Sequence, residues 1–185
     1  AFGRIDVLVN NAGVLRVPGD HKYILDVTEQ EWDLEVDSHL KGAFLCARAV
    51  IPHMAQAGGG SIVNIGSGAG YGKPNMAAYA SSKGAIVALS MAMAYDHFHE
   101  HVRVNVAIPG GGGIVSGMSV GRFGGDVGAF TRRPAPGTAA GRPATGRDLA
   151  NAVAFLLSGE AATISGTVID VGCFAHQGGP IPARP

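Results

Sequence analysis

Cysteine, tryptophan and an excess of either charge are scarce or absent in this chain, and each scarcity excludes something. The 185 residues contain 2 cysteines, Cys46 and Cys173, which form no CxxC pair, and 1 tryptophan. We therefore expect buried, reduced cysteines rather than a disulfide or a metal site. Lysine and arginine together number 14, as do aspartate and glutamate. This balance, with no basic run beyond Arg132-Arg133, predicts that nucleic acid is not a partner.

Long hydrophobic runs are also absent. No stretch approaches the roughly 18 apolar residues of a membrane helix, and the first residues show no signal-peptide pattern. We therefore expect no membrane partner and a cytoplasmic location. What the chain does contain is 46% hydrophobic residues and 29 glycines, a composition typical of a globular domain with a substantial core.

The segment from Tyr79 to Lys83, YASSK, predicts acid–base chemistry. The two residues are four apart in an apolar stretch that predicts a helix from Ala77 to about His99, so both side chains project from one face. A tyrosine is a poor acid or base at neutral pH, and a nearby ammonium favours its phenolate. Ser67, just upstream, offers a hydroxyl that would fix a substrate oxygen. A Tyr–Lys pair alone also occurs on ordinary solvated helices.

Four segments in a fixed order make the pattern specific. They are VLVNNAG at 7–13, SIVNIGS at 61–67, YASSKGA at 79–85 and RVNVAIPGG at 103–111. Together they resemble the short-chain dehydrogenase/reductase family, and the resemblance extends to about Gly172. It implies an α/β fold, a Rossmann-like doubly wound parallel sheet in three αβα layers. It also implies an enzyme that transfers a hydride between NAD or NADP and a small-molecule secondary alcohol or ketone.

The resemblance assigns roles to individual residues. Tyr79 would transfer the proton, Lys83 would lower the tyrosine pKa and hold the nicotinamide ribose, and Ser67 would bind the substrate oxygen. Where the family usually has an asparagine that completes a proton relay, this chain has His39. An imidazole both donates and accepts hydrogen bonds, so His39 is a candidate for the relay. The alternative is a histidine that is merely satisfied by backbone groups.

The resemblance also places the cofactor. Asn11, Ala12 and Gly13 would line its adenosine side. The loop at Pro109 and Gly110, together with Ile114 and Ser116, would pass its nicotinamide end, although this loop is about two residues longer than the family's PGxxxT pattern. NAD and NADP stay as alternatives, because the residue that reads the ribose 2′ position lies in a part of the fold that this sequence lacks.

The beginning of the chain departs most from the family. The apolar run Ile5–Val9 predicts a buried parallel strand at once, with no Gly-rich TGxxxGxG turn before it. Each βα unit takes roughly 30 residues, so we expect on the order of 80 residues and three strands to be missing upstream. Residues 1–177 would then be the C-terminal two-thirds of a single domain, followed by a flexible tail at 178–185. The alternative function is a truncated or degenerate relative without independent catalysis that acts as a binding or assembly partner.

Further elements follow from local signals. Thr28 and Glu31 predict a capping box that starts a helix, whose apolar positions should cover one face of the sheet: Trp32, Val36, Leu40, Phe44 and Leu45. Residues 58–60, GGG, predict a C-cap and turn. Residues 116–142 interrupt the alternation of strands and helices and predict a substrate-side lid, and residues 166–172 predict the last strand.

A stripe of small residues on the Tyr79 helix predicts close helix packing: Ala80, Gly84, Ala88 and Ala92. Family members pair through this helix and the preceding one, so we expect a homo-dimer or homo-tetramer; the alternative is that the stripe packs on its own sheet. His97, His99 and His101 alternate near the end of the same helix, where positive side chains complement the helix dipole. We predict no metal site there.

Overall fold

The computed structural model describes residues 3–14, 22–109, 114–121, 124–132, 138–140, 142 and 144–172. Its centre is a parallel sheet in the order β1-β2-β3-β4, formed by Val7–Asn10, Gly60–Ile65, Val102–Ile108 and Val168–Asp170. Leu8 pairs with Ile62, which pairs with Val104 on the other side. The runs of valine and isoleucine form these strands because the middle of a parallel sheet is buried on both faces.

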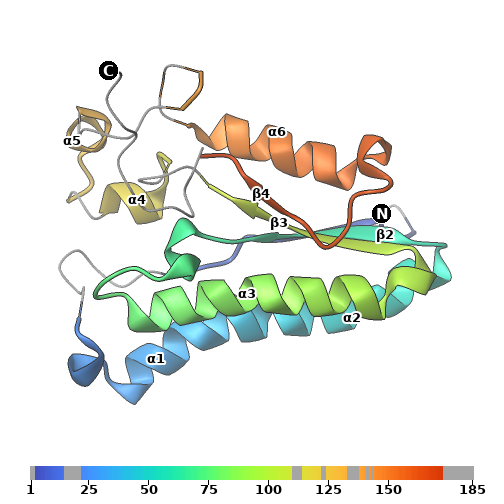
Figure 1. Cartoon of the computed structure of the whole chain (residues 1–185), viewed down its shortest axis with the longest axis horizontal. Coiled ribbons are helices and arrows are strands. Elements are labelled where there is room, and N and C mark those ends of the chain that lie inside the picture. The colour runs from blue at the N-terminus through green and yellow to red at the C-terminus, as the bar shows by residue number, and fades with distance from the viewer. Residues whose placement is uncertain are drawn as a thin grey trace, which may run out of the picture.

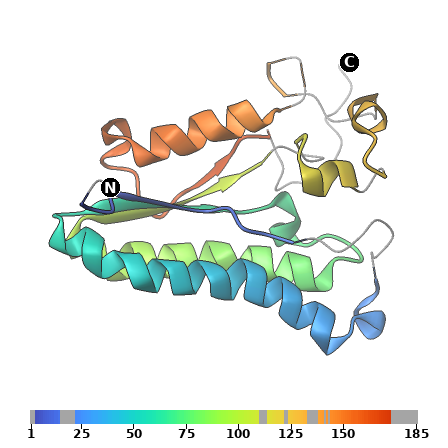
Figure 2. The same cartoon turned by 180° about the vertical axis from the view of Figure 1, so that it is seen from behind.

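Helices cover the sheet on both faces (Figure 1). The helices α2, Gly42–Gln56, and α3, Ala77–Asp96, lie side by side on one face, and α6, Gly146–Leu157, lies on the other (Figures 1 and 2). The shorter helices α4, Gly117–Gly121, and α5, Val127–Arg132, lie beyond the carboxyl ends of the strands. This arrangement is the three-layer Rossmann-like α/β fold that the sequence predicts.

Two apolar clusters hold the layers together. Between the sheet and α2 and α3 lies a fully buried cluster that includes Ala47, Met54, Ile62 and Val104. Between the sheet and α6 lies a second cluster around Leu156. Four 3₁₀ turns complete the described chain: η1 Ile24–Asp26, η3 Gly68–Tyr71, η4 Phe98–Glu100 and η5 Gly159–Ala161.

The predicted capping box before α1 and the predicted glycine C-cap after α2 are confirmed. The helix α1, Glu29–Val36, starts with a reciprocal capping box in which Thr28 Oγ1 accepts from the Glu31 N–H and Glu31 accepts from the Thr28 N–H. At the end of α2, the Gly58 N–H donates to Ala55 O and the Gly59 N–H donates to Met54 O, which is a Schellman motif. Gly58 has a φ of 88°, which favours glycine at this position.

The predicted sheet-facing stripe of the α1–α2 region is wrong by one residue. Trp32, Phe44 and Leu45 are exposed. The buried series consists instead of Glu35, His39, Ala43, Ala47, Ile51 and Met54. A π-helical segment, η2 Asp37–Lys41, joins α1 to α2, and with it the buried positions recur every four residues from Glu35 to Ile51, a wider spacing than the 3.6 residues of an α-helical turn.

Smaller predictions also need correction. The helix α3 ends at Asp96, three residues before the predicted end, because a 3₁₀ turn and His101 with a φ of 59° reverse the chain into β3. The last strand is shorter than the predicted residues 166–172. Cys46 is exposed rather than buried, and Cys173 and the tail at 178–185 lie outside the described residues. Among the helices described, none has the length and apolar character to cross a membrane.

Candidate functional site

The predicted site residues gather at the carboxyl ends of β1, β2 and β3, where α3 begins. Residues 11–14 follow β1, Ser67 follows β2 and Pro109 follows β3. Tyr79 lies in the first turn of α3, which begins at the same end of the sheet (Figure 1). In open α/β sheets this is the edge where ligands bind.

Tyr79 and Lys83 are both buried, with 8% and 6% of their surface exposed. Lys83 Nζ donates to the carbonyl oxygen of Ile65, the last residue of β2, at 3.0 Å. The same nitrogen lies 6.0 Å from the centre of the Tyr79 ring. Burial lowers the pKa of Lys83 to about 8, because an ammonium loses its hydration there. The helix thus holds a cationic nitrogen beside the phenol ring.

Ser67 begins the turn η3, and its Oγ accepts from the Ala69 N–H at 3.2 Å. This turn lies directly on α3 at a contact between two glycines. A Cβ built on Gly84 would lie 2.8 Å from Gly70 O, and one built on Gly70 would lie 2.8 Å from Gly84 N. The absence of both side chains lets the short connection between Ser67 and Tyr79 lie close to the helix.

His39 lies on the buried face of the π-helical segment and is bonded through both ring nitrogens. Its Nε2 accepts from the Val14 N–H at 2.9 Å, and its Nδ1 lies 2.8 Å from Ser82 Oγ. Its ring meets the Tyr79 ring edge to face, with centres 5.2 Å apart. Burial and the nearby Lys83 lower the pKa of His39 to about 4.

The predicted cofactor loop at 11–13 is exposed at the mouth of the site. The preceding residue, Asn10, is held by its Nδ2, which donates to Asn64 Oδ1 at 2.7 Å. A Cβ on Gly13 would lie 3.3 Å from His39 Nε2 and 3.6 Å from Met118 Cε, so this loop lies on the His39 ring and near α4. The absence of a side chain at Gly13 lets the loop lie this close to the His39 ring.

The second predicted cofactor segment is described in part. Pro109 follows β3, and Gly110 lies outside the described residues. Ile114 lies near the start of α6, since a Cβ on Gly146 would be 3.9 Å from Ile114 Cδ1. Ser116 begins α4, where its Oγ accepts from the Ser119 N–H at 3.1 Å.

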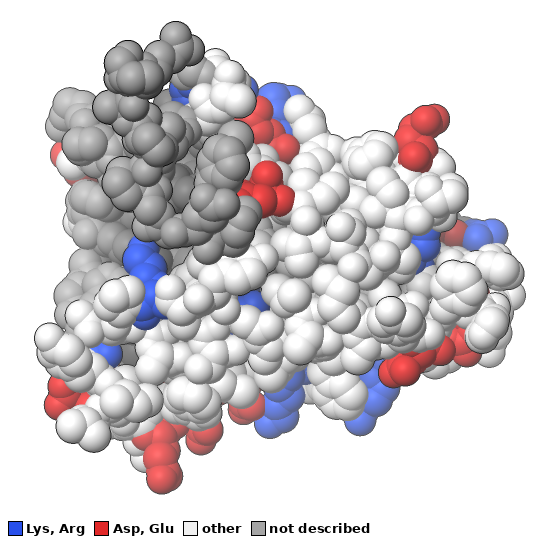
Figure 3. Space-filling view, viewed as in Figure 1, with Lys and Arg blue, Asp and Glu red and all other residues white. Residues whose placement is uncertain are grey.

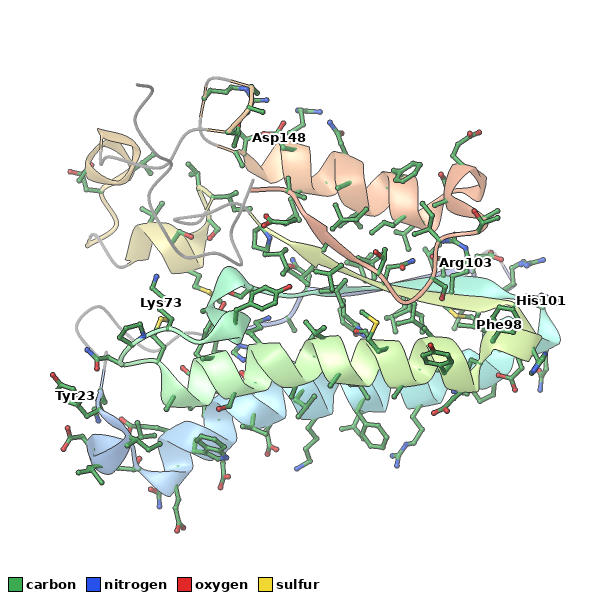
Figure 4. The ribbon with its side chains drawn as sticks, in the orientation of Figure 1. Tyr23, Lys73, Phe98, His101, Arg103 and Asp148 are labelled. Carbon is green, nitrogen blue, oxygen red and sulfur yellow. The ribbon has the colours of Figure 1, made fainter. Side chains whose placement is uncertain are left out.

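The three alternating histidines lie far from this site. Figure 4 shows His101 and Phe98 at the opposite end of α3, and a hydrogen bond joins His97 Nδ1 to the Glu100 carboxylate. No group of three or more His, Cys, Asp and Glu side chains suited to a metal ion occurs in the described part of the chain.

Sequence reasoning missed Ser82, Val14 and the Gly70–Gly84 contact. Ser82 is almost fully buried, and its Oγ donates to Tyr79 O at 2.9 Å. Its position three residues after Tyr79 was a usable signal, since i and i+3 share a helix face. Nothing local in the sequence connects Val14 to His39 or Gly70 to Gly84, because both contacts depend on how the layers stack.

Several known proteins are similar to this chain over most of its length. A family model described as Enoyl-(Acyl carrier protein) reductase matches residues 1–173. A probable short-chain type dehydrogenase/reductase from Bradyrhizobium diazoefficiens is 37% identical over 178 residues, which are 95% of this chain and 62% of that protein. A 3-oxoacyl-[acyl-carrier-protein] reductase of Staphylococcus aureus is 34% identical and is matched over 92% of this chain and 65% of its own length.

Solved structures give the same result. A gluconate 5-dehydrogenase from Burkholderia cenocepacia, crystallised with NADP and tartrate, is 30% identical and superposes with a TM-score of 0.76. The match covers 92% of this chain and 64% of that one. This chain therefore spans a little under two-thirds of the length of these relatives. The matched residues, the identities and the fold together show that the chain belongs to the short-chain dehydrogenase/reductase family.

Proposed function

We propose that this protein is an oxidoreductase that transfers a hydride between NAD or NADP and a secondary alcohol or ketone. The observation that carries the proposal is the placement of Tyr79 and Lys83, buried and adjacent, at the carboxyl ends of the strands. The names of the relatives support it, since they are dehydrogenases and reductases and one of them was solved with NADP.

The proposed chemistry divides between the cofactor and three side chains. When bound, the nicotinamide supplies or accepts the hydride. Tyr79 Oη takes the proton of the alcohol, or gives it to the ketone in reverse. The Lys83 ammonium stabilises the phenolate and holds the nicotinamide ribose, and the Ser67 hydroxyl donates to the substrate oxygen. These proposed roles would explain why the Lys83 ammonium lies beside the buried Tyr79 ring.

The proposed cofactor contacts come from two segments. Asn11, Ala12 and Gly13 line the adenosine side, and residues 109–116 pass the nicotinamide end through Pro109, Gly110, Ile114 and Ser116. The exposure of the first segment and the small side chains in both fit a ligand that lies along the strand ends. The Gly-rich turn that binds pyrophosphate in the family is not among residues 1–185.

The direct test is hydride transfer. NADH and NADPH oxidation is followed by absorbance at saturating cofactor with a panel of ketones, and the reverse reaction with secondary alcohols. We expect turnover with at least one pair and a loss of about 10²–10⁴-fold in kcat in Tyr79→Phe. Unchanged turnover in a folded Tyr79→Phe variant would show that the Tyr79 hydroxyl does not transfer the proton.

One observation favours the second candidate, a binding or assembly partner without independent catalysis. Among the described residues, β1 pairs with β2 alone, and Val7 and Val9 on this strand are 49% and 41% exposed. An open edge with apolar side chains favours pairing with another segment or chain. A folded chain that binds neither cofactor but gains stability from a partner strand would support this candidate.

We also propose that the protein forms a homo-dimer or homo-tetramer through α2 and α3. The outer positions of the small-residue stripe, Ala88 and Ala92, are exposed, and so are Phe44 and Leu45 on α2. The surface over α3 is largely uncharged (Figure 3). Small and apolar side chains on two adjacent helices suit close packing against the same face of a second copy.

A further inference from the structure

A chain of hydrogen bonds with one direction runs through His39. The backbone N–H of Val14 can only donate, so His39 Nε2, 2.9 Å away, accepts. The backbone carbonyl oxygen of Tyr79 can only accept, so the Ser82 hydroxyl donates its hydrogen to that oxygen, 2.9 Å away. Ser82 Oγ must then accept from His39 Nδ1 at 2.8 Å. These constraints fix a neutral imidazole with its proton on Nδ1.

This bond chain joins two parts of the site. Val14 ends the described loop that follows β1, and Tyr79 lies in the first turn of α3. The His39 ring lies between them, 2% exposed, under Gly13 and edge-on to the Tyr79 ring. Both ring nitrogens are already occupied by these bonds. A relay of protons through the side chain would require one of them to break.

We propose that His39 is a positioning residue that ties the loop at residues 11–14 to the first turn of α3. The tie keeps the loop that would line the cofactor at a fixed place relative to the phenol that would transfer the proton. In this respect the inference rests on the proposed function. The tie itself is a structural claim, and it holds or fails independently of catalysis.

Two readouts test it. Hydrogen exchange of the Val14 amide reports the tie, because this N–H is released when the ring loses its orientation. The dissociation constant for NADH or NADPH, measured separately from kcat, reports what the tie does for the cofactor loop. A relay role would lower kcat and leave both readouts unchanged.

The informative variant is Ser82→Ala, which breaks the chain at the end away from Val14. We expect its Val14 amide to exchange about tenfold faster and its cofactor to bind about three- to tenfold more weakly, as the loss of one buried hydrogen bond would cause. The matched control is Ser81→Ala, an exposed neighbour on the same helix, which should match the wild type.

Substitutions of His39 complete the test. His39→Ala should give the same changes as Ser82→Ala. His39→Gln, which offers an amide oxygen near the Nε2 position, should restore most of the Val14 protection. A Ser82→Ala variant with wild-type exchange at Val14 would overturn the proposal. If the wild type binds no cofactor, the proposed function fails, and the exchange of Val14 still decides whether the tie exists.

Discussion

Two buried titratable side chains at the site, His39 and Lys83, are both shifted toward their uncharged forms. Each is bonded to uncharged groups: His39 to a backbone N–H and a hydroxyl, and Lys83 to a carbonyl. Burial lowers the pKa of His39 to about 4 and that of Lys83 to about 8. Their ionisation is therefore linked to folding.

The pH dependence of stability follows from His39. Its folded pKa lies below its ordinary value, so below pH 6.5 the unfolded chain binds a proton that the folded protein must release. Stability is complete above pH 6.5 and is lost as the pH falls toward 4. We expect the free energy of unfolding to drop by about 2 kcal/mol between pH 7 and pH 5.

Urea unfolding at several pH values measures this drop. His39→Gln is the control, because its side chain does not titrate, and it should lose little stability over the same interval. Hydrogen bonds to Lys22 and Thr28 lower the pKa of the Glu31 carboxylate to about 2. Its protonation therefore affects stability below pH 4.5 and does not contribute to the expected drop between pH 7 and pH 5. A wild type that is as stable at pH 5 as at pH 7 would show that His39 can be protonated in place.

At the site, a motif is what makes single residues recognisable in the sequence. Tyr79, Lys83 and Ser67 stood out because their spacing has a chemical reason. Their roles stay predictions, since the structure gives their placement and not the reaction. For Ser82 the i, i+3 spacing to Tyr79 places it on the same helix face, but the spacing does not reveal that its oxygen lies between His39 and the backbone carbonyl of Tyr79.

At the scale of elements, the contact between η3 and α3 decides where Ser67 lies. Gly84→Ala would place a Cβ 2.8 Å from Gly70 O, a backbone atom that cannot rotate away. We expect the free energy of unfolding to fall by about 1–2 kcal/mol, because strain exceeds the gain in helix propensity. A displacement of Ser67 by about an ångström would also lower kcat by up to about a hundredfold.

Gly42→Ala is the matched control for that prediction. Gly42 is also helical, but a Cβ there would meet its nearest atom, Asp37 O, at 3.5 Å, which is an ordinary contact. This variant should raise the free energy of unfolding by about 0.5–1 kcal/mol through helix propensity alone. Thermal unfolding of both variants gives the comparison. Equal shifts in the unfolding temperature would mean that Gly84 does not contact Gly70 in solution.

Helix limits were easier to predict than helix faces. The capping box at Thr28 and the glycines at 58–60 are local signals, and both are confirmed. The buried face of α1 and α2 depends on the π-helical segment and on the sheet beneath, so the stripe that includes Trp32 and Phe44 was assigned to the wrong side. Phe44 and Leu45 of that stripe are exposed and belong to the proposed surface for a second copy.

At the scale of the whole molecule, the proposed assembly predicts a response to one added charge. Ala88→Arg places a long cation on the exposed side of α3, where it would be buried without a partner between two copies. We expect light scattering after size exclusion to show dissociation to smaller species. Ala150→Arg, on the exposed side of α6, is the control and should keep the wild-type mass. Equal masses for both variants would place the interface elsewhere.

The fold class was predictable as a whole because three of the four motifs mark the ends of successive strands and the fourth marks the start of the helix between two of them, an order that specifies a parallel sheet. The sequence alone does not specify the packing of α4 and α5 beyond the strand ends, where glycine and proline replace the apolar spacing that locates a helix. Figure 1 shows these helices at the same end of the sheet as the start of α3, the helix that carries Tyr79 in its first turn, as a substrate-side lid requires. Lid motion stays a prediction.

The measurement that tests the central claim most directly is a titration of the protein with NADPH and with NADH, followed by nicotinamide fluorescence. The account predicts saturable binding of at least one of them, weakened in Ser82→Ala and unchanged in Ser81→Ala. A folded protein that binds neither cofactor would contradict the proposal that this chain carries a functioning dehydrogenase site, and would favour the binding or assembly role that the open edge at β1 suggests.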